Sequence, residues 1–107
     1  MVNMEQIATS GINFELTEDQ QMLQKMAREF TAKEIIPVAE EYDHNSTFPM
    51  EIFQKARELG IANMAIPEAY GGVGATTLDD VIAAEELGYG CTGISTSIGA
   101  NNLGSLP

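Results

Sequence analysis

Hydrophobic residues recur at helical spacing in the first third of the chain. Residues 1–15 show no period, so we expect a loosely held, flexible arm there. Thr17 and Gln20 then have the spacing of a capping box, in which each side chain bonds the backbone amide of the other residue. The apolar residues that follow share one helical face: Met22, Leu23, Met26, Ala27 and Phe30. The pattern predicts a helix from about residue 17 to residue 35.

Prolines and a glycine divide the segment that follows. Pro37 lacks the amide proton that a helix needs, so residues 37–43 are expected to form a kinked continuation or a short second helix. Residues 44–47 are expected to form a turn. Pro49 suits the first position of a new helix, and Gly60 suits its left-handed C-terminal cap. The apolar residues between them lie on one face: Ile52, Phe53, Ala56 and Leu59.

A long loop and another helix come next. Residues 61–75 have no helical period and contain one proline and three glycines, with room for a short extended piece at 62–66. The residues that reopen a helix after this loop are Thr76, Thr77, Asp79 and Asp80. Its apolar stripe is predicted to be Leu78, Val81, Ile82 and Tyr89. We expect this helix to end near Gly88 or Gly90.

No charged side chain occurs from Leu87 to Pro107. We predict a central helix over about 92–104, and a helix without a charged face is expected to be buried on most sides. Ile94 and Ile98 supply one ridge of it. The neighbouring face carries only small side chains: Ser95, Thr96, Gly99 and Ala100. Two interpretations remain open: tight packing between helices, or the wall of a cleft for a slender apolar ligand.

The whole pattern predicts an all-α bundle of about four to five helices with short connections. The length of 107 residues fits one domain. The net charge of −11 argues against nucleic acid and anionic membrane surfaces as partners, and the glycines and polar residues of the last segment argue against membrane insertion. Cys91 is the single cysteine, so no internal disulfide can form, which agrees with a reducing compartment. The N-terminus resembles neither a secretory signal nor an unprocessed transit peptide.

Side chains that could carry chemistry are sparse. The Gly72-Val-Gly74 run lacks the third glycine of a dinucleotide fingerprint, so a loop that needs positive φ is the better interpretation. His44 is interpreted as a turn residue and Cys91 as a thiol between two helices. Glu85 is expected to be partly buried in a structural contact. The sequence shows no cluster of metal ligands and no evident catalyst.

Four stretches of the chain resemble the acyl-CoA dehydrogenase family. Together they cover nearly all of it from Phe14 onward: FELTEDQQMLQKMAREF (14–30), IIPVAEEYD (35–43), FPMEIFQKARELGIANMAIPEAYGGVGA (48–75) and EELGYGCTGISTSIGANNLGSLP (85–107). The run IPEAYGGVGA after a helix ending in ELG is the most specific, and YGCTG is most similar to mitochondrial medium-chain members.

The resemblance implies that residues 16–107 are the N-terminal domain of such an enzyme, an antiparallel helix bundle. A middle β-domain and a C-terminal helical domain would follow, with FAD and the acyl-CoA substrate between them. A glutamate in the C-terminal domain would remove a proton from the acyl-CoA while a hydride leaves to the flavin, giving trans-2-enoyl-CoA in fatty-acid β-oxidation. The catalytic glutamate and nearly all FAD contacts would lie beyond Pro107, so we expect the 107-residue piece alone to be inactive.

Two sets of residues are carried over from the family. The wall of the acyl cavity maps onto Ser95, Thr96, Gly99, Ala100 and Leu103. Medium-chain relatives can have an acidic residue where this chain has Gly99, so the resemblance implies a deeper cavity here. A docking surface for electron-transfer flavoprotein maps onto Leu23, Ala27, Phe30, Ile61, Val73 and Ala83, although plain core packing would explain the same residues.

The family further implies a homo-oligomer, tetrameric in its known members, in the mitochondrial matrix or the bacterial cytoplasm. An acyl-CoA oxidase fragment and a non-enzymatic helical binding module remain as alternatives.

Overall fold

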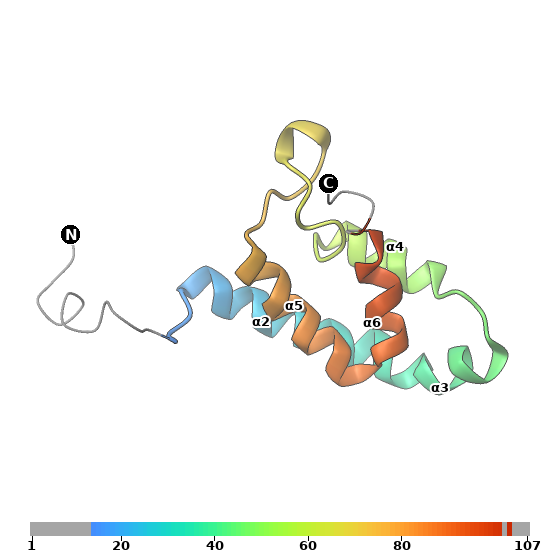
Figure 1. Ribbon diagram of the computed structural model, residues 1–107. Helices are drawn as coiled ribbons and strands as arrows, with labels where there is room; N and C mark the ends of the chain where they lie inside the picture. Colours follow the sequence, from blue (N-terminus) through green and yellow to red (C-terminus); the bar gives the residue numbers. More distant parts are fainter. Residues whose placement is uncertain (1–13, 102, 104–107) are drawn as a thin grey trace, which may run out of the picture.

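The computed structural model describes residues 14–101 and residue 103 (Figure 1). The elements in chain order are α2 (Glu18–Phe30), the π-helical segment η1 (Thr31–Ile35), α3 (Ile36–Asn45), α4 (Met50–Glu58), the 3-10 turn η2 (Glu68–Tyr70), α5 (Thr77–Gly90) and α6 (Thr92–Gly99). No strand occurs among the described residues, and the predicted all-α class is confirmed. Most of the arm predicted at residues 1–15 lies outside the described residues.

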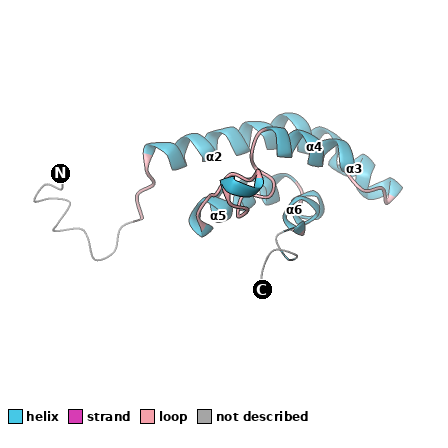
Figure 2. Ribbon diagram, turned by 90° about the horizontal axis from the view of Figure 1, so that it is seen from above, coloured by secondary structure: helices cyan, strands magenta, loops and turns pink. Residues whose placement is uncertain are grey.

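The helices form two layers. Figure 2 shows α2, α3 and α4 on one side and α5 and α6 on the other. Side chains from both layers meet in one core, whose most deeply buried members include Ile35 of η1 and Ala56 of α4. Burial of such apolar surface contributes about 25 cal/mol per Å² to folding.

Helix α2 begins where the capping box predicts. The Thr17 hydroxyl accepts the Gln20 amide proton at 3.1 Å, and the Gln20 side-chain oxygen accepts the Thr17 amide proton at 3.0 Å. Both bonds satisfy amides that the first turn of a helix leaves without an intrahelical partner. The predicted stripe is confirmed at Ala27 and Phe30, which are buried, but not at Met22, which is 69% exposed because no described element covers that side of the first turns.

The chain passes Pro37 without leaving the helix. Elements α2, η1 and α3 follow one another directly, and the Ile36 amide bonds the carbonyl of Thr31, five residues earlier. In a regular α-helix the ring of Pro37 would clash with the carbonyl of Lys33, and the wider π turn just before it relieves this crowding. The predicted continuation is therefore confirmed.

The predicted turn at residues 44–47 begins too early. Helix α3 extends through Asn45, and the left-handed residue that ends it is Ser46, with φ of +54°. The exposed His44 is thus in the last helical turn rather than in a loop.

Helix α4 starts one residue later than predicted, since Pro49 is its N-cap rather than its first helical residue. Gly60 follows the C-cap with φ of +81°, which confirms the predicted left-handed cap. The extended piece predicted at 62–66 does not form. Asn63 has φ of +58°, and the Ile66 amide bonds the Asn63 carbonyl at 3.2 Å, so the backbone turns there.

Helices α2 and α5 lie side by side and run in the same direction. Near their N-termini, the Gln20 amide group donates to the Asp79 carboxylate at 3.4 Å. Near their C-termini, Arg28 pairs with Glu86 at 3.2 Å. The expected antiparallel arrangement does not extend to this pair, because the loop between α4 and α5 returns the chain to the end at which α2 begins.

Helix α5 buries a different face from the predicted one. Leu78, Val81 and Tyr89 are 51%, 55% and 73% exposed. Of the predicted stripe only Ile82 is buried; the other buried residues of α5 are Ala83, Glu86 and Leu87. Apolar residues occur on both sides of α5, and contact with α2 and α6 selects one side. For the same reason the buried carboxylate is Glu86, and the predicted Glu85 is exposed.

Helix α6 crosses from the end of α5 with a single residue, Cys91, between them. Ile94 and Ile98 are 3% and 2% exposed, so the predicted apolar ridge is confirmed. The element ends at Gly99, and Ala100 forms a turn before further helical residues, so the predicted span of 92–104 is interrupted.

Candidate functional site

The predicted acyl wall occupies the side of α6 opposite its buried ridge. Thr96, Gly99 and Ala100 are exposed, and Leu103 is 75% exposed. Ser95 is half-buried at the edge of this face. A Cβ added at Gly99 would meet nothing within 4 Å. The face is therefore largely exposed among the described residues, and its role as an acyl wall remains a prediction.

A small hollow adjoins two of these residues. Ser95 and Gly99 line it together with Ile61 and Ala83, at the junction of α5, α6 and the loop after α4. Its volume is about 30 Å³. A cavity needs about 10–15 Å³ to hold one water molecule, so this hollow has room for a water or two and none for an acyl chain.

The predicted docking residues divide into two groups. Four of them belong to the core: Ala27, Phe30, Ile61 and Ala83, none more than 5% exposed. The other two, Leu23 and Val73, line a groove of about 350 Å³ between α2 and the loop that joins α4 to α5. The remaining residues of this groove, called the α2 groove below, are Asp19, Met26, Leu59, Gly60, Met64, Gly74, Ala75 and Asp79. Its apolar floor and two carboxylates could receive an apolar side chain beside a basic one.

The loop that forms one wall of the α2 groove is held by its own backbone. The Gly74 amide bonds the Ile66 carbonyl at 2.8 Å, and the Ala75 amide bonds the Met64 carbonyl at 2.8 Å. A Cβ at Gly72 would overlap the backbone of Ile66. Gly74 has φ of +67°, which confirms that this run serves a loop with positive φ.

Asp79 connects the α2 groove to the start of α5. Its carboxylate accepts the Thr76 amide proton at 3.0 Å and a bond from Gln20 at 3.4 Å. The hydrogen bond from the Thr76 backbone, followed by that from the Thr76 side chain, lowers the pKa of Asp79. The negative charge of Asp79 on this wall of the groove is therefore part of the N-terminal cap of α5.

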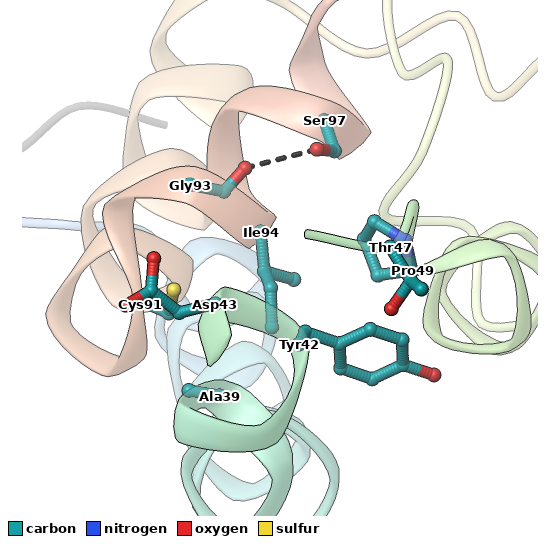
Figure 3. Close-up of a pocket in the computed structure, with 9 residues that line it drawn as sticks. All are labelled: Ala39, Tyr42, Asp43, Thr47, Pro49, Cys91, Gly93, Ile94 and Ser97. Atoms are coloured by element: carbon teal, nitrogen blue, oxygen red, sulfur yellow. Dashed lines mark hydrogen bonds between the residues drawn. The ribbon is translucent and has the colours of Figure 1, made fainter. Parts of the chain in front are cut away.

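A third hollow, of about 180 Å³, was not predicted (Figure 3). It is lined by Ala39, Tyr42, Asp43, Thr47, Pro49, Cys91, Gly93, Ile94 and Ser97. Ser97 turns its hydroxyl back to the Gly93 carbonyl at 3.0 Å, and the half-exposed Cys91 lies between α5 and α6 as predicted. These residues come from α3, the segment between α3 and α4, the connector before α6 and α6 itself, so no spacing in the sequence identifies them as neighbours.

No feature of the described residues marks a flavin site. Within residues 14–101 and 103, every buried side-chain nitrogen or oxygen already has a hydrogen-bond partner. None of these atoms is left for a cofactor to bond. The Gly72 amide donates to the Pro67 carbonyl and the Gly74 amide to the Ile66 carbonyl, so neither glycine amide is free to bind a pyrophosphate.

The described part of the chain also has no set of three His, Cys, Asp or Glu side chains that could hold a metal ion. None of its helices has the length and apolar character needed to cross a membrane.

These features define an all-α domain that offers an uncovered helix face and an apolar groove. A family model described as "Acyl-CoA dehydrogenase, N-terminal domain" matches residues 17–107. The chain belongs to this family.

Curated relatives agree with this assignment. The chain is 45% identical to a probable acyl-CoA dehydrogenase, YngJ, of Bacillus subtilis over 90% of this chain and 26% of the relative. It is 39% identical to a probable mitochondrial medium-chain specific acyl-CoA dehydrogenase of Caenorhabditis briggsae over 92% of this chain and 24% of the relative. It is 46% identical to acryloyl-CoA reductase (NADH) of Anaerotignum propionicum over 75% of this chain and 20% of the relative. The chain thus spans about a quarter of the length of these relatives.

A solved structure has the same fold. It is described as "Electron transferring flavoprotein of Acidaminococcus fermentans: Towards a mechanism of flavin-based electron bifurcation". The match has a TM-score of 0.71 at 38% identity and covers 78% of this chain and 22% of the other.

Proposed function

We propose that the whole protein oxidises a fatty acyl-CoA thioester to a trans-2-enoyl-CoA with bound FAD, and that this domain supplies one wall of the acyl cavity. The observation that carries the proposal is the family match over residues 17–107. The relatives described as acyl-CoA dehydrogenases support it. In the proposed enzyme, the residues that bind FAD and the catalytic base belong to parts of the protein beyond this chain.

The acyl wall is proposed on the exposed side of α6. Thr96, Gly99 and Ala100 are small, uncharged and exposed, and a Cβ at Gly99 would meet nothing within 4 Å. A small-residue face lets a slender apolar chain approach the helix backbone closely, and Leu103 at its far end supplies a bulky apolar stop. The buried Ile94 and Ile98 pack the opposite side of the helix against the core, which holds the proposed wall in a fixed position.

The first experiment uses the complete, flavin-loaded protein. Anaerobic addition of saturated acyl-CoA thioesters is expected to bleach the flavin absorbance and to release the matching trans-2-enoyl-CoA. A flavin that stays oxidised with every thioester from butanoyl-CoA to palmitoyl-CoA would refute the proposed function.

The wall itself is tested at Gly99. A phenylalanine there has open space on this domain and would protrude into the cavity, so Gly99→Phe is expected to shift the kcat/KM profile toward shorter acyl chains. Gly99→Ala is the matched control and should leave the profile near that of the wild type. An unchanged profile in Gly99→Phe would contradict the wall assignment.

The α2 groove is proposed as the docking surface for an electron-transfer flavoprotein. Its apolar floor around Leu23 and Val73 suits an inserted apolar side chain. The fold match to a structure described as an electron transferring flavoprotein supports an acceptor of this kind.

Leu23→Glu tests this docking surface. The variant is expected to slow reduction of the acceptor and to leave flavin reduction by substrate intact. Met22→Glu is the matched control, because Met22 is the neighbouring residue on α2, is 69% exposed and lies outside the groove. Equal slowing of both half-reactions in Leu23→Glu would mean damage to the core rather than loss of docking.

A second candidate function is reduction of a short enoyl-CoA. The 46% identity to a relative described as acryloyl-CoA reductase (NADH) favours it. An oxidase that passes electrons to oxygen is a third. Reoxidation of the reduced flavin by acryloyl-CoA, by oxygen or by the flavoprotein acceptor, measured side by side, separates the three. The mitochondrial matrix and the bacterial cytoplasm both supply acyl-CoA, and relatives described as mitochondrial and as bacterial both match this chain.

A further inference from the structure

Helix α5 approaches the π-helical segment at a glycine. A Cβ built on Gly90 would overlap the Cγ2 methyl of Thr31 and would stand 3.2 Å from Cγ2 of Ile35 and 3.3 Å from Cγ1 of Ile36. Contacts this tight at three side chains mean that any residue larger than glycine forces the two elements apart. Gly88, two residues earlier on α5, has its nearest neighbour at 3.9 Å from such a Cβ.

Thr31 cannot yield to a larger residue at Gly90. Its side chain is 1% exposed, and its hydroxyl donates to the Ala27 carbonyl at 2.8 Å. Rotating the methyl group away from Gly90 would break that hydrogen bond inside the core, and a β-branched side chain has few alternative rotamers in a helix. Thr31 is also the first residue of the π turn that accommodates Pro37, so its position is set by the backbone of the long helix.

The position of Gly90 fixes the start of α6. Gly90 is the last residue of α5 and Thr92 the first of α6, so Cys91 alone connects them. The Cys91 amide bonds the Leu87 carbonyl at 3.2 Å, and the Cys91 carbonyl accepts from the Ser95 amide at 3.0 Å. A displacement of Gly90 is therefore passed on to α6 rather than absorbed by a loop.

We infer that Gly90 is a positioning residue for acyl chain length: its contact with Thr31 sets how far α6 projects into the acyl cavity. This inference rests on the proposed function of the α6 face. Ile94 and Ile98 are buried and pack α6 against the core, so an enlarged contact at Gly90 moves the helix outward, toward the side of Thr96 and Gly99, and a smaller contact lets it settle inward. Outward movement narrows the cavity and disfavours long chains.

The experiment compares kcat/KM for a long and a short acyl-CoA in the complete, flavin-loaded protein. Gly90→Ala is expected to lower the long-to-short ratio about tenfold, since a shift of about 1 Å can change a rate a hundredfold. Gly88→Ala, the same substitution on the same helix, should leave the ratio unchanged. Thr31→Ser/Gly90→Ala moves one methyl group across the contact and keeps the hydroxyl, and it should restore most of the wild-type ratio. Thr31→Ser alone should raise the ratio, because it opens the contact without overpacking it.

The outcomes separate this inference from the proposed function. A wild-type protein whose flavin no acyl-CoA reduces would overturn the proposed function and this inference with it. An active wild type with an unchanged ratio in Gly90→Ala, or with an equal shift in Gly88→Ala, would overturn the positioning role only. If Gly90→Ala does not fold, the single Thr31→Ser variant decides: a ratio equal to that of the wild type rejects the role of this contact.

Discussion

Replacing Arg28 with methionine is expected to destabilise the protein through Glu86, the residue that loses its partner. The Arg28 Nε lies 3.2 Å from the Glu86 Oε2, and the two side chains are 67% and 8% exposed. Methionine preserves most of the apolar stem of Arg28, so the change removes the charge of the ion pair and the guanidinium group, whose carbon lies 5.8 Å from the centre of the Tyr89 ring.

The magnitude follows from the unequal burial of the two partners. Because Arg28 is mostly exposed, the attraction itself contributes no more than about 1 kcal/mol. A buried carboxylate that loses the partner of its ion pair costs about 1–3 kcal/mol. We therefore expect Arg28→Met to lower the free energy of unfolding by about 2 kcal/mol. The double variant Arg28→Met/Glu86→Met removes both polar groups and should lie within about 1 kcal/mol of the wild type.

Urea unfolding followed by circular dichroism measures these differences, with Lys25→Met, at an exposed lysine of α2, as the matched control. The control should unfold at the wild-type midpoint. A double variant as unstable as Arg28→Met, or an Arg28→Met variant as stable as the control, would refute the argument that Glu86 carries the cost.

Two further predictions concern the α5 cap and the loop before it. The pKa of Asp79 is lowered from 3.8 by its hydrogen bonds from Thr76, so the cap's contribution is complete above that pH and is lost as the pH falls through the lower, folded-state value. As the pH falls below 3.8, the thermal unfolding midpoint of the wild type should therefore drop more than that of Asp79→Asn. Parallel plots of midpoint against pH for the two proteins would contradict the cap assignment. Gly72→Ala should cost about 1–3 kcal/mol because its Cβ overlaps the backbone of Ile66, which cannot rotate away. Gly88→Ala, with ordinary contacts at its Cβ, should show no such loss in the same measurement, and an equal loss would reject the steric argument.

The sequence by itself determined the features that depend on neighbours a few residues away. The capping box of Thr17 with Gln20 formed as predicted, and Thr76 with Asp79 formed a second one at the predicted start of a helix, because each bond joins residues three apart. Gly60 took the left-handed conformation for an equally local reason. The resemblance to the acyl-CoA dehydrogenase family also came from short local runs, and the family match confirms it.

Only the tertiary structure decided which faces are buried and which residues share a groove. Helix α5 has apolar residues on both sides, and its packing against α2 and α6 buried Ala83 and Leu87 while leaving Val81 exposed. Of the six residues predicted to dock a partner, four are buried in the core. Whether an apolar residue is buried or exposed depends on which other elements cover it, and the residue type alone does not decide this. The α2 groove unites α2 with a loop about fifty residues further on, and no local period encodes a contact between segments so far apart in the chain.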